Sequence, residues 1–212
     1  MYQLFYYPRN ASWAPHLMLS ELNVDYELKL VDRKNDAQKD AQYLALNPTG
    51  RIPTLIHGEQ TIFESAAIGL YLCEQHVNAN LLPAMGNPLR VQCYQWLFYL
   101  TSTVQSELMV YFYPEKHTTD STHSPAIVLA QEKLISEGLK LLDQQIANKR
   151  FLMGDHITIC DYFLFMMCHW ASDLKRPPIS FTNLGRLMRE LASRESFRQV
   201  CEVEGTSLTI YD

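Results

Sequence analysis

The sequence predicts an α/β domain followed by an all-α domain. Strand and helix patterns alternate over the first eighty residues, whereas every pattern from residue 88 onward is helical. The segment between them, residues 79–87, is rich in Asn, Pro and Gly, which is typical of a linker. We therefore predict one domain at residues 1–78 and a second at residues 88–212.

The first domain is expected to have the order β-α-β-α-β-β-α. Its first two strands are separated by a helix, which predicts a parallel pair with a right-handed crossover. The segment His57-Gly58-Glu59 between its last two strands is a hairpin signal and predicts an antiparallel pair. The predicted strands are 2–7, 26–31, 53–57 and 60–63, and the predicted helices are 13–22, 38–46 and 65–76.

The second domain is expected to consist of helices alone. One helix start carries a specific signal, because Thr158 stands three residues before Asp161 in a capping-box arrangement. We assign that pair a structural role. The predicted helices are 88–113, 125–147, 159–171, 183–192 and 196–201.

Composition narrows the function classes. The formal net charge is −5 and there is no long basic run, which gives no electrostatic basis for binding nucleic acid or an anionic membrane. No apolar run approaches the ~20 residues that span a bilayer, and the N-terminal residues read as a strand rather than a targeting signal. The five cysteines have no metal-ligand spacing, so we expect buried, reduced thiols, a cytoplasmic location and no metal.

One stretch, residues 47–55 with the sequence NPTGRIPTL, places a proline where an apolar strand is expected to begin. Proline has no N–H for a sheet ladder, and it is therefore confined to strand starts and edges. From spacing alone we expect the bond between Ile52 and Pro53 to be trans, because only about 5–6% of such bonds are cis in folded proteins. A free backbone edge at this point can pair with a peptide-like ligand.

A second stretch, residues 63–68 with the sequence FESAAI, ends one strand and opens a helix. Ser65 is predicted to be the helix N-cap. The first turn of the helix leaves N–H groups unpaired at the positive end of the dipole, where a carboxylate can bind. Glu64 is either a solvated acid or a partner for an ammonium group. The two stretches together predict a site for one small zwitterion.

Four motifs, in this order and spacing, resemble the cytosolic glutathione transferase superfamily over nearly the whole chain. They are the alternating first domain, the NPTGRIPTL segment, the Glu64-Ser65 pair and the capped turn at 154–161. The segment 4–16 is most similar to bacterial, beta-like members. The resemblance implies a thioredoxin-like first domain that binds glutathione and a helical second domain that binds a co-substrate.

The resemblance also implies roles for individual residues in glutathione binding. Pro53 would be cis, and the backbone of Ile52 would pair with the cysteinyl part of glutathione. Glu64 and Ser65 would bind the γ-glutamyl ammonium and carboxylate groups. Lys34 would approach the glycyl carboxylate, unless it is simply a solvated lysine.

The implied reaction is attack by the glutathione thiolate on a small apolar electrophile, a detoxification chemistry. A hydroxyl group that donates a hydrogen bond to the sulfur favours the thiolate. Two hydroxyls compete for this role: Ser12, at the start of the first helix, which we favour, and Tyr6, at the end of the first strand. A helix cap and a core aromatic are their respective structural alternatives.

Two departures from beta-like members affect the expected chemistry. Ala11 stands where such proteins commonly have a cysteine, and Gln105 stands where a histidine is often found. Both argue against thiol–disulfide exchange through a protein cysteine. Trp13, Tyr111 and Gln105 are candidates for the electrophile pocket, although aromatic residues at helical spacing are more often core.

The resemblance implies a homodimer that forms through the helices near 65–76 and 88–113. The leading hypothesis is an enzyme, because the whole set of implied glutathione-site residues is retained. The alternatives are a non-catalytic or regulatory glutathione-binding member, or glutathione-dependent peroxidase or isomerase chemistry at the same site.

Overall fold

A mixed four-stranded sheet forms the centre of the N-terminal part of the chain. The computed structural model describes all of residues 1–212. The strands are β1 (Tyr2–Tyr6), β2 (Tyr26–Leu30), β3 (Thr54–His57) and β4 (Gln60–Phe63). They lie in the order β2-β1-β3-β4, with β1 parallel to β2, and with β3 antiparallel to both β1 and β4. The predicted crossover pair and hairpin are therefore confirmed.

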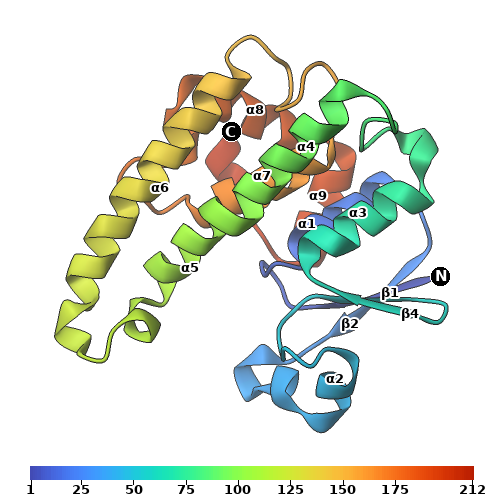
Figure 1. Cartoon of the computed structure of the whole chain (residues 1–212), viewed down its shortest axis with the longest axis horizontal. Coiled ribbons are helices and arrows are strands. Elements are labelled where there is room, and N and C mark those ends of the chain that lie inside the picture. Colours follow the sequence, from blue (N-terminus) through green and yellow to red (C-terminus); the bar gives the residue numbers. More distant parts are fainter. The chain divides into compact units, whose positions relative to one another are not determined.

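Helices cover both faces of this sheet. They are α1 (Trp13–Glu21), α2 (Ala41–Leu46) and α3 (Ser65–Gln75), and Figure 1 shows α1 and α3 together on one side of the strands and α2 on the other. Alternation along β1 sends Leu4 into the core and turns Phe5 to the opposite face, where its ring lies 6.0 Å from that of Tyr43 in α2. This is the thioredoxin-like β-α-β-α-β-β-α order that the sequence predicts.

The C-terminal helix belongs to the same compact unit as the sheet. The chain forms two compact units, one of Met1–Leu82 with Ala192–Ile210 and the other of Pro83–Leu191 with Tyr211–Asp212. Helix α9 (Glu195–Val203) packs on α1. The linker at 79–87 remains a prediction. The predicted second domain, residues 88–212, includes α9, whereas in the structure α9 belongs to the first unit.

The second unit is helical throughout, as predicted. Its helices are α4 (Pro88–Phe98), α5 (Gln105–Phe112), α6 (Ser124–Ile146), α7 (Ile159–Trp170) and α8 (Thr182–Ala192). None of the helices in the chain combines the length and the apolar character that a membrane span requires. All five cysteines are buried and free, as the sequence predicts.

The prediction of one continuous α-helix over 88–113 is wrong in its middle. A π-helical segment, η4 (Tyr99–Val104), separates α4 from α5. Side-chain hydroxyls stabilise the widened backbone, because Thr101 donates to the Leu97 carbonyl at 3.0 Å and Ser102 to the Phe98 carbonyl at 2.6 Å. Such bonds to the carbonyl four residues earlier compete with the regular helix ladder.

The start of α7 is organised by the buried carboxylate of Asp161. One oxygen accepts from the Leu152 N–H at 2.8 Å, and the other accepts from the N–H and the hydroxyl of Thr158 at 2.8 and 3.0 Å. The predicted capping box is therefore confirmed. Burial raises the pKa of Asp161 to about 6 even though these hydrogen bonds favour the ionised form.

Replacement Asp161→Asn should lower the free energy of unfolding by about 2–3 kcal/mol at pH 7.5. The amide has one acceptor oxygen for two groups of donors, and its NH₂ group faces N–H donors. Urea denaturation followed by circular dichroism measures the effect. The exposed Asp155→Asn provides a charge-matched control in the same turn and should change stability by less than about 0.5 kcal/mol. Equal stability of the two variants would contradict the assigned role of Asp161.

Candidate functional site

The strand register brings four chain segments to one edge of the sheet. Phe5 in β1 pairs with Thr54, the first residue of β3, and Thr54 also pairs with Phe63, the last residue of β4. Tyr6 pairs with Leu30, the last residue of β2. The segments that follow β2, β1 and β4, and the segment that precedes β3, therefore all leave the sheet at this edge. These segments contain most of the residues that the sequence singles out.

The segment before β3 offers an unpaired backbone edge. The bond between Ile52 and Pro53 is cis, so the expectation from spacing alone is wrong and the one from family resemblance is confirmed. Ile52 is half-buried and stands two residues before the first paired residue of β3. Its backbone N–H and C=O make no hydrogen bond within the chain. A peptide-like ligand can therefore pair with Ile52 as an added strand would.

Asn47 holds this segment in place. Its side-chain NH₂ donates to the Arg51 carbonyl at 2.7 Å, and its Oδ1 accepts from the N–H and hydroxyl of Thr49 at 3.1 and 2.7 Å. The Tyr43 hydroxyl donates to the same Arg51 carbonyl at 2.7 Å. Asn47 is only 1% exposed, so these bonds replace the water that the turn excludes.

Glu64 has an unusual backbone conformation at the junction of β4 and α3. Its φ is +70° and its ψ is 113°, a region that residues other than glycine rarely adopt. The structure corrects the predicted cap, because Glu64 is the N-cap and Ser65 is the first helical residue. The Glu64 carbonyl already accepts the Ile68 N–H at 2.9 Å. Strained positions of this kind cluster at functional sites.

The groups at this junction suit a zwitterionic ligand, which carries one positive and one negative charge. Glu64 is exposed, and its carboxylate makes no hydrogen bond or ion pair within the chain. Ser65 is 6% exposed and begins an eleven-residue helix whose first-turn N–H groups have no partner within the helix. A carboxylate can bind at that helix end while an ammonium group pairs with Glu64.

The hydroxyl of Ser12 is engaged within the protein. Ser12 is the N-cap of α1 but makes no side-chain bond to that helix. Instead its hydroxyl donates to the Tyr7 carbonyl at 3.2 Å and accepts from the Tyr7 N–H at 3.4 Å. Ser12 is also fully buried. To donate to a ligand sulfur, this hydroxyl must give up the Tyr7 carbonyl and become accessible.

Tyr6 presents the other candidate hydroxyl. The phenol makes no hydrogen bond within the chain, and its ring meets that of His16 edge-on at 6.2 Å. Partial burial, with a further contribution from the negative charge of Glu204, raises the pKa of Tyr6. Tyr6 therefore remains a neutral hydrogen-bond donor at neutral pH.

Lys34 lines a cavity of about 220 Å³ together with Tyr7 and Arg33. Lys34 is exposed, whereas Arg33 is half-buried and donates to the Asn10 side-chain oxygen at 3.0 Å. Two cations beside one cavity favour an anionic group there. Sequence reasoning selected Lys34 but not Arg33, although the two are adjacent.

Glu204 is a site-positioning residue that sequence reasoning missed. It lies 195 residues from Arg9, yet its Oε2 accepts the Arg9 N–H at 2.7 Å. Its Oε1 accepts from Nδ1 of His16 at 2.7 Å, and Nε2 of the same ring lies 3.2 Å from the Tyr26 hydroxyl. The His16 and Glu204 side chains are fully buried. Arg9 has a φ of +57°, so this network fixes an unusual turn just before Ser12.

The three candidates for the electrophile pocket are divided between the two units. Gln105 and Tyr111 are half-buried on α5 in the second unit. Trp13 is the first residue of α1 and is fully buried in the first unit. Complete burial argues against contact between Trp13 and a ligand. None of the described residues forms a group of three or more His, Cys, Asp or Glu side chains that could hold a metal ion.

A thioredoxin-like domain with an unpaired strand segment beside a cis-proline, followed by a helical domain, defines the class of protein. Sequence models of the glutathione S-transferase N-terminal and C-terminal domains match residues 2–74 and 123–189. The chain belongs to the cytosolic glutathione transferase superfamily.

Bacterial members are among the similar proteins. Glutathione S-transferase GstA of Escherichia coli O157:H7 is 26% identical, over 96% of this chain and 98% of the relative. The beta-class enzyme of Sphingomonas chungbukensis has a TM-score of 0.84 at 26% identity, covering 97% of this chain and 100% of that one. A sphingomonad enzyme solved with glutathione has a TM-score of 0.83 at the same identity and coverage.

Asn47→Asp should reduce stability by about 2 kcal/mol, because a carboxylate of the same shape cannot donate to the Arg51 carbonyl. The segment with Ile52 should loosen with it, and glutathione affinity should fall. Urea denaturation and calorimetric titration with glutathione measure the two effects. The exposed Asn78→Asp is the matched control and should change neither quantity. Unchanged stability of Asn47→Asp would show that the turn does not depend on this donor.

Glu204→Gln should also weaken the site, although the residue lies far from it in sequence. The amide loses the negative charge that strengthens both bonds, and its NH₂ group can pair with His16 only if the ring changes tautomer, a loss of about 2 kcal/mol. We expect a lower unfolding free energy and weaker glutathione binding. The exposed neighbour Glu202→Gln is the control on the same helix. If both variants bind glutathione like the parent protein, Glu204 does not position the turn at Arg9.

Proposed function

We propose that this glutathione S-transferase binds glutathione along the shared edge of its sheet. The order of the polar groups along that edge carries the proposal. From β2 to β4 the groups are the Lys34 and Arg33 cations, the Tyr6 and Ser12 hydroxyls, the Ile52 backbone and the Glu64 carboxylate beside the α3 N-terminus.

Glutathione carries complementary groups in the same order. Its glycyl carboxylate pairs with Lys34, its thiol meets a hydroxyl, its cysteinyl backbone pairs with Ile52, and its γ-glutamyl end meets Glu64 and Ser65. Three strand spacings of about 4.8 Å give about 14 Å between the outer groups, the reach of an extended tripeptide with its terminal groups.

The reaction begins with loss of the thiol proton to solvent water. A free thiol with a pKa of about 8.5 is only a few per cent ionised at neutral pH, and each unit of lowering is worth ~1.4 kcal/mol. A hydroxyl that donates to the sulfur favours the thiolate. The thiolate then attacks an electrophilic carbon, a C–S bond forms, and the leaving group departs with its electron pair.

Tyr6 replaces Ser12 as our favoured donor to the sulfur. The Ser12 hydroxyl is buried and already donates to the Tyr7 carbonyl, whereas the Tyr6 phenol has no partner within the chain. Gln105 and Tyr111 on α5 are proposed to contact a small apolar electrophile. Neither the fold nor the relatives favour a non-catalytic role or peroxidase or isomerase chemistry.

We further propose a cytoplasmic homodimer with a detoxification role. Val91 and Phe98 on α4 are 70% and 53% exposed and stand seven residues apart, so they share one helix face that a second copy can cover. Five free cysteines suit a reducing compartment.

An ultraviolet titration of the bound thiolate tests the proposed activation. The parent protein should lower the pKa of bound glutathione by about two units, and Tyr6→Phe should raise it again by about one unit. Ser12→Ala should leave the pKa of the bound thiol nearly unchanged. A shift with Ser12→Ala alone would restore Ser12 as the donor, and a shift with neither variant would contradict activation by a hydroxyl. If the parent protein binds no glutathione at low millimolar concentration, the assigned site is wrong.

A further inference from the structure

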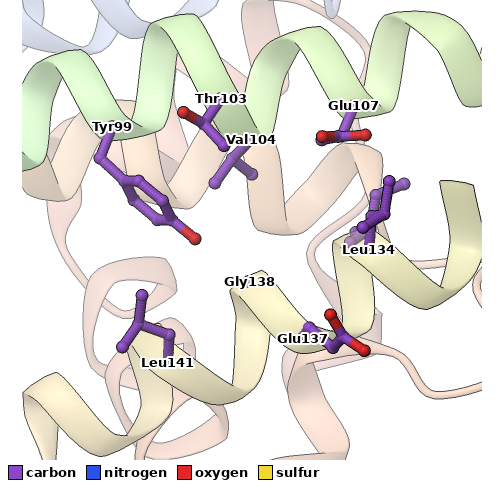
Figure 2. A pocket seen from close by; sticks show the side chains of 9 residues that line it. Tyr99, Thr103, Val104, Glu107, Leu134, Glu137, Gly138 and Leu141 are labelled. Carbon is purple, nitrogen blue, oxygen red and sulfur yellow. The ribbon is translucent and has the colours of Figure 1, made fainter.

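A second cavity lies entirely within the helical unit. It has a volume of about 270 Å³ and lies between the η4–α5 segment and α6. Figure 2 shows the Tyr99 ring projecting from one wall toward Leu141 on the other, and the Val104 side chain projecting toward Gly138. None of the residues proposed to bind glutathione or the electrophile lines it.

Two local features of the backbone create this space. Tyr99, Thr103 and Val104 all belong to the π-helical segment, whose wider turn displaces them from regular α-helical positions. On the facing helix, Gly138 has no side chain to fill the gap. A Cβ atom at Gly138 would lie only 3.2 Å from the Tyr99 hydroxyl. The cavity therefore depends on both a π turn and a glycine, and π turns are frequent at functional sites.

The lining combines an apolar wall with negative charge. Val104, Ile135, Leu134 and Leu141 supply the apolar surface, and the last two are each 44% exposed. Figure 2 shows the carboxylates of Glu107 and Glu137 toward the Leu134 end and the Tyr99 ring toward the Leu141 end.

The charge of the cavity is not balanced by the protein. Neither carboxylate makes an ion pair or hydrogen bond within the chain, and no Lys, Arg or His lines the space. Burial raises the pKa of Tyr99, and the negative charge of Glu107 on the same wall of the cavity raises it further. An anion such as glutathione is disfavoured here, and a cation with an apolar body is favoured.

We propose that this cavity binds a small organic ammonium ion that carries an aromatic ring. The ammonium group lies between Glu107 and Glu137, and the ring packs against Val104, Leu141 and the Tyr99 ring. The volume is slightly below the roughly 300 Å³ at which pockets for drug-sized ligands begin, which fits an amine with a single ring. This site is separate from the glutathione edge and does not depend on the reaction proposed there.

Calorimetric titration of the full chain with phenethylammonium chloride tests the site. We expect saturable one-to-one binding with a dissociation constant of about 1 mM or below. Glu107→Gln and Glu137→Gln should each weaken binding by about fivefold or more, as expected for loss of a charged hydrogen-bond partner. Glu115→Gln removes an exposed carboxylate of the same unit outside the cavity and should leave the affinity unchanged.

Three further measurements separate this ligand class from others. The anion 3-phenylpropionate should not bind, and methylammonium, which lacks a ring, should bind at least about tenfold more weakly. Gly138→Leu should fill the space and abolish binding while circular dichroism remains unchanged. If that variant misfolds, the two Gln variants still decide the matter.

Several results would overturn the proposal. The first is the absence of saturable phenethylammonium binding, and the second is a loss of affinity in Glu115→Gln as large as in Glu107→Gln. The third is an affinity for methylammonium equal to that for phenethylammonium. The fourth is displacement of phenethylammonium by Mg²⁺, which would indicate a simple acidic pair. Occupation of the cavity by a second copy of the chain would also overturn it. In that case sedimentation would show a dimer that Glu107→Gln weakens, with no amine binding.

Discussion

The register of the four-stranded sheet is the constraint on which the candidate glutathione site depends. Leu4 and Leu55 pair with each other across β1 and β3, and both side chains are fully buried. Slipping one strand by a single residue would turn its leucine out of the core. The buried apolar side chains therefore fix the register. Because the strand ends then lie level, the segments that contain Tyr6, Ile52 and Glu64 leave the sheet at one edge.

Buried polar side chains stabilise the irregular backbone of those segments, which lies outside the hydrogen-bonded strands. Asn47 donates to the Arg51 carbonyl in the turn before Ile52, and Glu204 accepts the N–H of Arg9 in the turn before Ser12. In each case a buried side chain pairs with a backbone group of a turn that has no partner in a regular strand or helix. Glu64 differs from both, because it is exposed and conformationally strained, and its carboxylate has no partner in the chain. That combination suits a binding group more than a structural one.

The same physical requirement shapes the helical unit. Asp161 supplies acceptors for the Leu152 and Thr158 N–H groups at the start of α7. In η4, the hydroxyls of Thr101 and Ser102 donate to carbonyls of the preceding turn. The widened turn opposite Gly138 leaves a space that the surrounding side chains do not fill. The π turn and the missing side chain at Gly138 together leave room for the acidic, partly apolar cavity.

The sequence alone determined the element order, the two structural classes of domain and the family, because hydrophobic periodicity and short motifs are local signals. It located Ile52, Pro53, Glu64 and Ser65 correctly as a group at strand and helix ends. It could not determine the π turn, since helical periodicity persists through Tyr99–Val104. Nor could it show that Glu64 rather than Ser65 is the N-cap of α3, because this depends on the positive φ of Glu64, which no sequence pattern indicates.

Only the tertiary structure decided which hydroxyl is free and which distant residue supports it. Burial of Ser12 against Tyr7, and the contact between Glu204 and Arg9 across 195 positions, arise from packing between segments remote in sequence. The sequence gives the chemical type of each residue, but its solvent exposure and hydrogen-bond partners depend on the segments that pack against it. The sequence therefore predicts the ligand class, whereas our proposal of Tyr6 rather than Ser12 as the donor rests on the fold.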